Sequence, residues 1–172
     1  MYIFEEFDGK HVKITADHMR YNSRFLADSQ EAASKVVADL NRPLILAQLA
    51  EYRFEVETSG ITLGDQIVLT DRESQAQLTG AMSSLRDELI TTTRWKGPNG
   101  FVQVTLETIK PIAQAVAVHV STCFEVEATL TEELEGIVDH EVMVDYNVRQ
   151  AFDDLYRPPT GEMEVDDGGD DA

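Results

Sequence analysis

Cysteine is almost absent from this sequence, which has Cys123 and no other among its 172 residues. A single cysteine cannot form a disulfide within the chain, and no cysteine pair is present to build a zinc site. We therefore expect the chain to fold in a reducing compartment, without a structural metal or any other cofactor.

Basic residues are scarce: 14 Lys and Arg stand against 32 Asp and Glu, a formal charge of −18. That charge repels a phosphate backbone, so nucleic acid is not an expected partner. Six of the acidic residues and no basic one lie between Gly161 and Ala172, which leaves −12 on the rest of the chain. The acidic excess either keeps the protein soluble or attracts a basic partner.

Long apolar runs are also missing, and no stretch approaches the ~18 apolar residues of a membrane span. The first ten residues, MYIFEEFDGK, contain acidic residues where a signal peptide has a basic end. We expect neither a membrane span nor an export signal, and therefore synthesis and folding inside the cell.

The sequence contains no nucleophile elbow, no phosphate-binding loop and no dinucleotide fingerprint. His119 and Cys123 share a helical face, but a metal would need two further ligands, so both are expected to pack in the interior. The adjacent residues 139–141 (Asp-His-Glu) point in different directions, and the acidic run 164–171 lacks the ligand spacing of a calcium loop. We expect no catalytic residue, no metal ligand and no enzymatic activity.

Glycine-containing turns separate three pairs of short β-prone runs. Asp8-Gly9 and Gly64-Asp65 suit the two-residue turns of tight hairpins, and residues 97–100 suit a wider reversing loop. The predicted hairpin strands are 2–7 with 10–15, 61–63 with 66–69, and 91–96 with 101–105.

Apolar residues recur at helical spacing from residue 28 to residue 60. Asp28 with Glu31 predicts the cap of a first helix, and Pro43 is expected to end it. Proline is suited to the first turn of a helix, so a second helix is expected from Pro43 until Gly60.

Two further helices are predicted. Thr70 with Glu73 forms the pattern of a capping box before an apolar stripe. That stripe contains Leu78, Ala81, Met82, Leu85 and Leu89. The longest helix is expected to begin at a cap on Thr108, because Pro111 is tolerated only near a helix start, and to end at Gly136.

The segment after Gly136 has two interpretations. Residues 142–148 alternate apolar and polar as in a strand, whereas Phe152, Leu155 and Tyr156 continue at helical intervals, and both interpretations are left open. Pro158-Pro159 ends the ordered packing, and the acidic residues beyond are expected to form a flexible tail.

Together these patterns predict an α+β fold of several helices and short antiparallel hairpins. We expect an N-terminal hairpin segment over 1–27, a helix–hairpin core domain over 28–136, an interaction segment over 137–160 and a flexible acidic tail over 161–172. Trp95, between Arg94 and Lys96, is either an exposed binding aromatic or a core residue, and the core is favoured. The expected partner interface uses apolar and aromatic residues near the two ends: Tyr2, Phe4, Tyr146, Phe152, Leu155 and Tyr156.

Residues of about 44–134 resemble an uncharacterised domain family that tailed phages and prophages encode among their tail genes, in tail-fibre, tail-fibre-assembly and similar proteins. The resemblance is carried by an ordered combination: Tyr52-Arg53 with Glu57 and Gly60, then Thr70 to Gln75, then Trp95-Lys96 with Gly100-Phe101, then His119 and Cys123-Phe124. The family has no catalytic assignment, so the resemblance implies a phage context and a structural or assembly role.

The function expected from this reading is that of a non-enzymatic virion component of the phage tail, in its fibre or baseplate region. Its partners would be other tail proteins, with self-association left open. One alternative is a tail-fibre assembly chaperone that is absent from the virion. The other is an acidic mimic of DNA that inhibits a host DNA-binding protein. A cell-wall glycan hydrolase is the enzymatic alternative, and only the abundance of carboxylates favours it.

Overall fold

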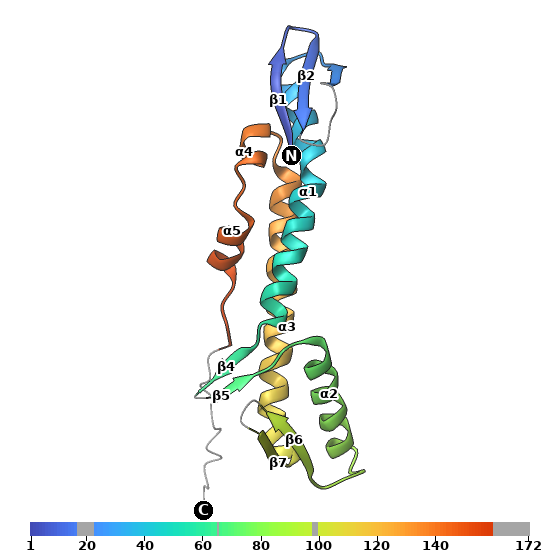
Figure 1. Cartoon of the computed structure of the whole chain (residues 1–172), viewed down its shortest axis with the longest axis vertical. Coiled ribbons are helices and arrows are strands. Elements are labelled where there is room, and N and C mark those ends of the chain that lie inside the picture. The colour runs from blue at the N-terminus through green and yellow to red at the C-terminus, as the bar shows by residue number, and fades with distance from the viewer. Residues whose placement is uncertain (17–22, 65, 98–99, 160–172) are drawn as a thin grey trace, which may run out of the picture. The chain divides into compact units, whose positions relative to one another are not determined.

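The computed structural model describes residues 1–16, 23–64, 66–97 and 100–159. In this part of the chain five helices and three small antiparallel sheets form an α+β fold, which confirms the predicted fold class (Figure 1). The helices are α1 (Gln30–Thr58), α2 (Arg72–Arg86), α3 (Leu106–Gly136), α4 (His140–Val144) and α5 (Val148–Leu155). The predicted flexible tail lies outside the described residues.

The seven strands form sheets of three, two and two strands. The first sheet contains β1 (Tyr2–Phe7), β2 (His11–Ala16) and β3 (Ser23–Leu26) in that order. The other two are hairpins, β4 (Ile61–Leu63) with β5 (Gln66–Val68) and β6 (Thr93–Gly97) with β7 (Gly100–Val104).

The chain divides into two compact units. The first contains residues 1–54 and 124–156, and the second contains residues 55–123 with the described residues from Arg157 onward. These boundaries fall within α1 and α3 and differ from the four segments predicted from the sequence. A buried cluster of the first unit contains Val12, Ile14, Ala33 and Val37. The core of the second contains Ile61, Leu78, Leu85, Val104, Ile109 and Val116.

The N-terminal hairpin is confirmed, with Phe4 opposite Ile14 and Phe7 opposite Val12. Its turn forms because the Asp8 carboxylate accepts the backbone N–H of His11 at 2.7 Å, while Gly9 has a φ of +91°. The third strand, β3, was not predicted, because its SRFL sequence has no apolar alternation. It adds to the other side of β2.

Two details of the first helical region differ from the prediction. The cap is Ser29, whose hydroxyl accepts the Ala32 N–H at 3.1 Å, and not Asp28. Pro43 does not end the helix: α1 continues through it to Thr58. Buried residues at helical spacing on both sides of the proline, including Ala38, Ile45 and Leu49, keep one apolar face in the interior. This packing outweighs the lost N–H of the proline.

The hairpins β4–β5 and β6–β7 are confirmed, although part of each turn lies outside the described residues. The caps of the two helices that follow them differ from the prediction by one to three residues. Asp71 caps α2 by accepting the N–H groups of Glu73 and Ser74, and Thr105 stands at the start of α3 in place of Thr108. The predicted stripe on α2 ends at Leu85, because Leu89 lies beyond the helix and is 76% exposed.

The ambiguous segment after Gly136 is helical. Asp139 caps α4 by accepting the backbone N–H groups of Glu141 and Val142, and Asn147 caps α5 by accepting that of Gln150. The alternating pattern of residues 142–148 therefore does not form a strand. The C-terminal end of α3 is closed by Arg42 on α1, which donates to the carbonyls of Leu134 at 3.0 Å and Ile137 at 2.7 Å. A cation at this position satisfies carbonyls that have no partner within the helix.

Candidate functional site

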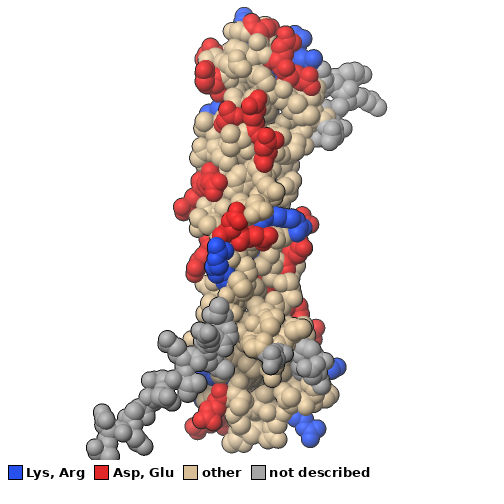
Figure 2. Space-filling view, turned by 90° about the vertical axis from the view of Figure 1, so that its left-hand side faces the viewer, with Lys and Arg blue, Asp and Glu red and all other residues tan. Residues whose placement is uncertain are grey.

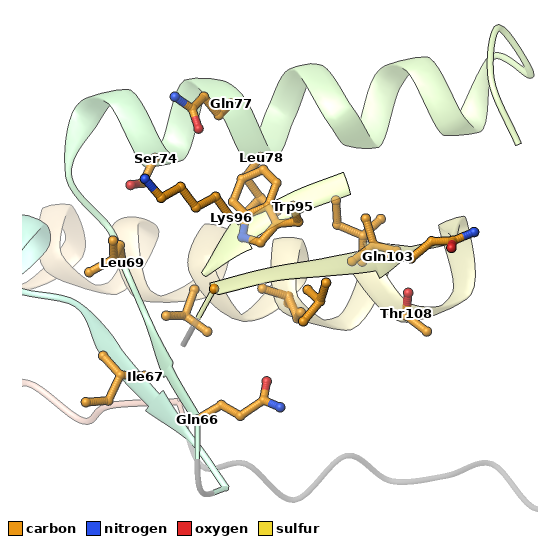
Figure 3. Close-up of a pocket in the computed structure, with 16 residues that line it drawn as sticks. Gln66, Ile67, Leu69, Ser74, Gln77, Leu78, Trp95, Lys96, Gln103 and Thr108 are labelled. Atoms are coloured by element: carbon orange, nitrogen blue, oxygen red, sulfur yellow. The ribbon is translucent and has the colours of Figure 1, made fainter. Parts of the chain in front are cut away.

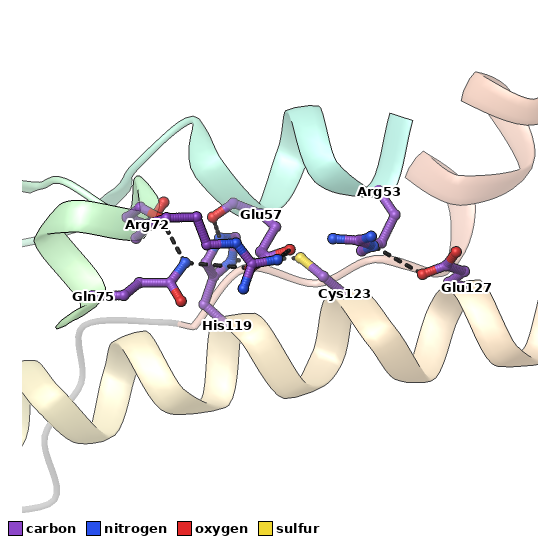
Figure 4. Close-up of polar contacts among 8 residues, drawn as sticks. Arg53, Glu57, Arg72, Gln75, His119, Cys123 and Glu127 are labelled. Carbon is purple, nitrogen blue, oxygen red and sulfur yellow. Dashed lines mark hydrogen bonds and ion pairs between the residues drawn. The ribbon is translucent and has the colours of Figure 1, made fainter. Parts of the chain in front are cut away.

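A buried carboxylate lies at the centre of the second unit. Glu57, in the last turn of α1, is 0% exposed. The Arg72 Nη2 atom lies 3.0 Å from each of its two oxygens, and the Gln75 side-chain amide donates to one of them at 3.3 Å (Figure 4). A charge without water around it is stable only with such partners.

Local structure places both partners on the same side of α2. The Asp71 cap fixes the helix start, so Arg72 is its first residue and Gln75 follows one turn later. Hydrogen bonds from Ser74 and from two backbone N–H groups hold the pKa of Asp71 below its usual value. The cap therefore carries a full negative charge at the positive end of the helix dipole.

Thr70 connects this network to the end of α1. It is 0% exposed, and its hydroxyl accepts the Gly60 N–H at 2.8 Å. The Gln75 amide also donates to the Thr70 carbonyl at 2.6 Å. Gly60 has a φ of +94°, and a Cβ there would lie 3.1 Å from the Val68 carbonyl oxygen, so glycine is required on two counts. Thr70, which the sequence predicted as a helix cap, thus links the end of α1 to the start of α2.

His119 and Cys123 reach the network from α3, and they are 1% and 0% exposed. The His119 Nε2 atom lies 3.0 Å from the Glu57 carbonyl oxygen, which can only accept, so Nε2 carries the proton. In the neutral ring Nδ1 is then an acceptor, and it lies 3.9 Å from the Cys123 sulfur. The expected interior packing of both residues is confirmed.

No group of three or more potential metal ligands occurs in the part of the chain that the structure describes. The His119–Cys123 pair is enclosed, and a reactive cysteine needs access to its substrate. Its chemistry is therefore hydrogen bonding inside the core. The sequence showed only the i, i+4 spacing of the pair. The contact with Glu57 spans 62 positions, which no local pattern reveals.

The residues that carry the family resemblance converge here. Glu57, Gly60, Thr70 to Gln75, His119 and Cys123 all belong to or adjoin this one network. In the first unit Arg53, another residue of the pattern, binds Glu127 at 2.8 Å and lies over the Phe124 ring at 4.4 Å. This part of the pattern is thus explained by contacts that join helices and hairpins within each unit.

The remaining part of the pattern, Trp95-Lys96 and Gly100-Phe101, forms the β6–β7 hairpin. Trp95 packs against the core of the second unit, as the favoured interpretation predicted. The hairpin also forms one wall of a pocket of about 330 Å³, whose other walls are β5, α2 and the start of α3 (Figure 3). Figure 3 shows Trp95 beside Leu78 in this pocket. Sequence reasoning did not find the pocket, because its walls come from four separate segments.

The six residues predicted as a partner interface lie in the first unit, but not all are available to a partner. Phe152 is 0% exposed and makes an edge contact with Tyr52, so its assignment as an interface residue is wrong. Tyr156 stacks on Phe152 and is partly buried. Leu155 is 45% exposed.

The two N-terminal interface candidates pack inward in part. Phe4 lies 4.6 Å from the His140 ring, between ring centres, and contacts the buried cluster of the first unit. Both backbone polar groups of Tyr2 bind the Asn41 side chain, at 2.7 and 2.8 Å. His140 in turn forms two hydrogen bonds with Ser34, and residues 139–141 form the start of α4, which Asp139 caps.

Tyr146 is the last of the six. Its hydroxyl is shielded from solvent and has no hydrogen-bond partner among the described residues. Burial raises the pKa of Tyr146 to about 12, and the negative charge of Glu133 acts in the same direction. The ring also lines a polar pocket with Tyr52 and Arg149.

Acidic side chains are spread over the face shown in Figure 2, with few basic ones among them. Residues 55–123 are less acidic than the rest of the chain: they contain eight acidic and five basic residues, a net −3. The acidic run 164–171 lies outside the described residues. Among the described helices none is both long and apolar enough to cross a membrane.

The fold and site define an α+β protein in which a buried polar network ties helix ends to hairpins beside an open apolar pocket. The chain belongs to the family described as a domain of unknown function, DUF4376, which matches residues 41–148. That range contains the whole network and the pocket. Neither curated proteins nor solved structures gave a match. The family description names no activity.

Proposed function

We propose that this chain is a non-enzymatic protein of a tailed phage and a structural component of the tail, in its fibre or baseplate region. The phage context rests on the resemblance carried by residues 44–134. We propose contact with other tail proteins as the mode of action, because most residues of the pattern are used in structural contacts within the fold.

The exposed apolar surface beside the pocket carries the proposal. Ile67 and Leu69, at and just after β5, are 59% and 48% exposed, and Phe101 and Val102 on β7 are 70% and 55% exposed. Three of these four side chains line the same pocket. Exposed apolar side chains gathered at one pocket are typical of sites that bind another protein.

Quantitative mass spectrometry of purified virions tests the proposal. A structural component is expected at a fixed ratio to known tail proteins, and this ratio should survive repeated gradient purification. Absence from virions, with recovery on the tail-fibre protein from infected cells, would instead identify an assembly chaperone.

The DNA-mimic alternative is favoured only by the acidic excess, most of which lies outside residues 55–123. It predicts salt-sensitive capture of a host DNA-binding protein, and added duplex DNA should displace that protein. If capture is insensitive to DNA, this alternative is removed while the tail proposal stands.

A further inference from the structure

The pocket of the second unit is an open groove with an apolar floor. Leu78, Trp95 and Ile109 line it, and each belongs to or packs against the core. Figure 3 shows Leu78 beside Trp95. The volume of the groove, about 330 Å³, is within the range of sites that bind ligands or side chains of a partner. Apolar side chains are thus the first requirement for an occupant.

The charges around the groove differ from those of the chain as a whole. No carboxylate lines it, and its one charged lining residue is Lys96. The sequence has no acidic residue between Glu88 and Glu107, although the chain carries −18. Arg94 is exposed two positions before Lys96, and neither cation forms an ion pair with any described residue. The groove therefore favours an occupant with carboxylates.

The backbone of β5 gives the third requirement. All three residues of β5, and Leu69 after it, line the groove. Within the described chain β5 pairs only with β4, so its second edge has no strand beside it. That edge contains neither proline nor charge, which are the usual means of blocking strand addition. An extended occupant can bond to such an edge through its main chain.

From these three observations we propose that the groove binds an extended segment of a partner protein in which apolar and acidic side chains alternate. Its main chain adds along β5, its apolar side chains fill the floor, and its carboxylates face Lys96 and Arg94. This inference rests on the proposed function, since it names the chemistry of the contact through which the protein would act.

A fluorescence anisotropy titration tests this inference. The probe is a labelled peptide in which leucine and valine alternate with glutamate, and the matched probe has lysine at each glutamate position. The full chain should bind the glutamate probe at least about tenfold more tightly than the lysine probe. Equal binding of the two probes, or no binding of either, overturns the proposal.

Substitutions that introduce negative charge test whether the probe binds in the groove. Lys96→Glu and Val102→Asp should each weaken binding of the glutamate probe by about tenfold or more. Lys110→Glu is the matched control, because it changes the net charge as much as Lys96→Glu does while Lys110 is exposed outside the groove. The Lys110→Glu variant should therefore bind the probe as tightly as the unmodified chain does. All three side chains are at the surface, and Trp95 fluorescence will confirm that each variant folds. An equal loss of affinity in Lys110→Glu would show that net charge alone weakens binding, and it would overturn the proposal.

The chain itself contains an alternating acidic segment, Glu162-Met163-Glu164-Val165-Asp166. A variant lacking residues 161–172 separates this segment from a partner. If the glutamate probe binds only that variant, the groove is filled by the chain's own tail and the partner proposal is overturned. Equal binding by both forms supports it. None of these outcomes alters the virion measurement, so the two proposals can fail separately.

Discussion

Glu57 shows how one buried residue can organise the contacts between several helices. The carboxylate is fully buried, it is held by Arg72 and Gln75, and the carbonyl of the same residue accepts from His119. Loss of either kind of contact would remove a partner from a polar group that is shielded from water, which costs more than a lost surface contact. The residue therefore sets how the end of α1, the start of α2 and the middle of α3 meet within the second unit.

The same network predicts the reactivity of Cys123. Because the thiol is 0% exposed, labelling with Ellman's reagent in native buffer should be at least about a hundredfold slower than in guanidinium chloride. The chain has one cysteine, so absorbance reports this site alone. Complete labelling of the native protein at the denatured rate would contradict the buried position.

Tyr146 makes a testable contribution to stability at alkaline pH. Its pKa is raised from 10.0 to about 12 by burial, so between these values the unfolded chain loses a proton that the folded chain keeps. The stability contributed by the protonated hydroxyl is present below pH 10.0 and is lost as the pH rises through about 12. Between pH 10.0 and about 12, the denaturation midpoint of Tyr146→Phe should therefore fall less than that of the unmodified chain. A parallel fall in both proteins would mean that the hydroxyl titrates alike in the folded and unfolded chains.

At the scale of elements, α1 differs most from the sequence prediction. Pro43 signals a helix end by local rules, but the buried positions before and after it lie on one continuous face. Burial of that face contributes more than the missing hydrogen bond costs. A proline can therefore remain within a helix that tertiary packing defines.

Replacing this proline tests the explanation. Pro43 is exposed, so Pro43→Ala loses little packing and gives the Asp39 carbonyl a backbone donor at position 43. We expect the free energy of unfolding to rise by about 1–3 kcal/mol, as measured by thermal circular dichroism. Gln48→Ala, at an exposed position of the same helix, is the control and should change little. A fall in stability for Pro43→Ala would show that the proline itself is needed.

The sequence predicts some elements well because their signals are local. Asp8-Gly9 and Gly64 mark turns, and those two hairpins form where the dipeptides place them. The observed helix caps lie one to three residues from the predicted ones. Several serine, threonine and aspartate residues stand close together at these helix starts, and any of them can accept the first N–H groups. The strand β3 has no apolar alternation and pairs only through β2.

The candidate site was less predictable than the hairpins. Arg72 and Gln75 lie 15 and 18 positions from Glu57, and His119 lies 62 positions away, so their contacts depend on the tertiary fold. The family resemblance grouped these residues, but it did not indicate which contacts they make. The interface prediction failed at Phe152 because a helical apolar residue near the chain end can be buried as readily as exposed.

In the second unit, framework and contact surface use different residues for the most part. Most residues of the family pattern between 55 and 123 build the framework, whereas Trp95 and Lys96 of the pattern line the groove beside β5 that we propose as the surface for partners. The uneven charge agrees with this division: residues 55–123 carry −3 of the total −18. Function is therefore expected in exposed side chains of the second unit as well as near the two ends of the chain.

The central claim is that the family pattern serves structure, and unfolding of Arg72→Met tests it most directly. The substitution leaves the buried Glu57 carboxylate without its guanidinium, so the second unit should lose about 2–4 kcal/mol of stability. Trp95, the only tryptophan, packs in that unit and reports its unfolding through fluorescence. Arg86→Met, at the last residue of the same helix, breaks an exposed pair with Asp87 and should leave the transition unchanged. Equal transitions for Arg72→Met and the unmodified chain would contradict the claim and point to a chemical role for the pattern.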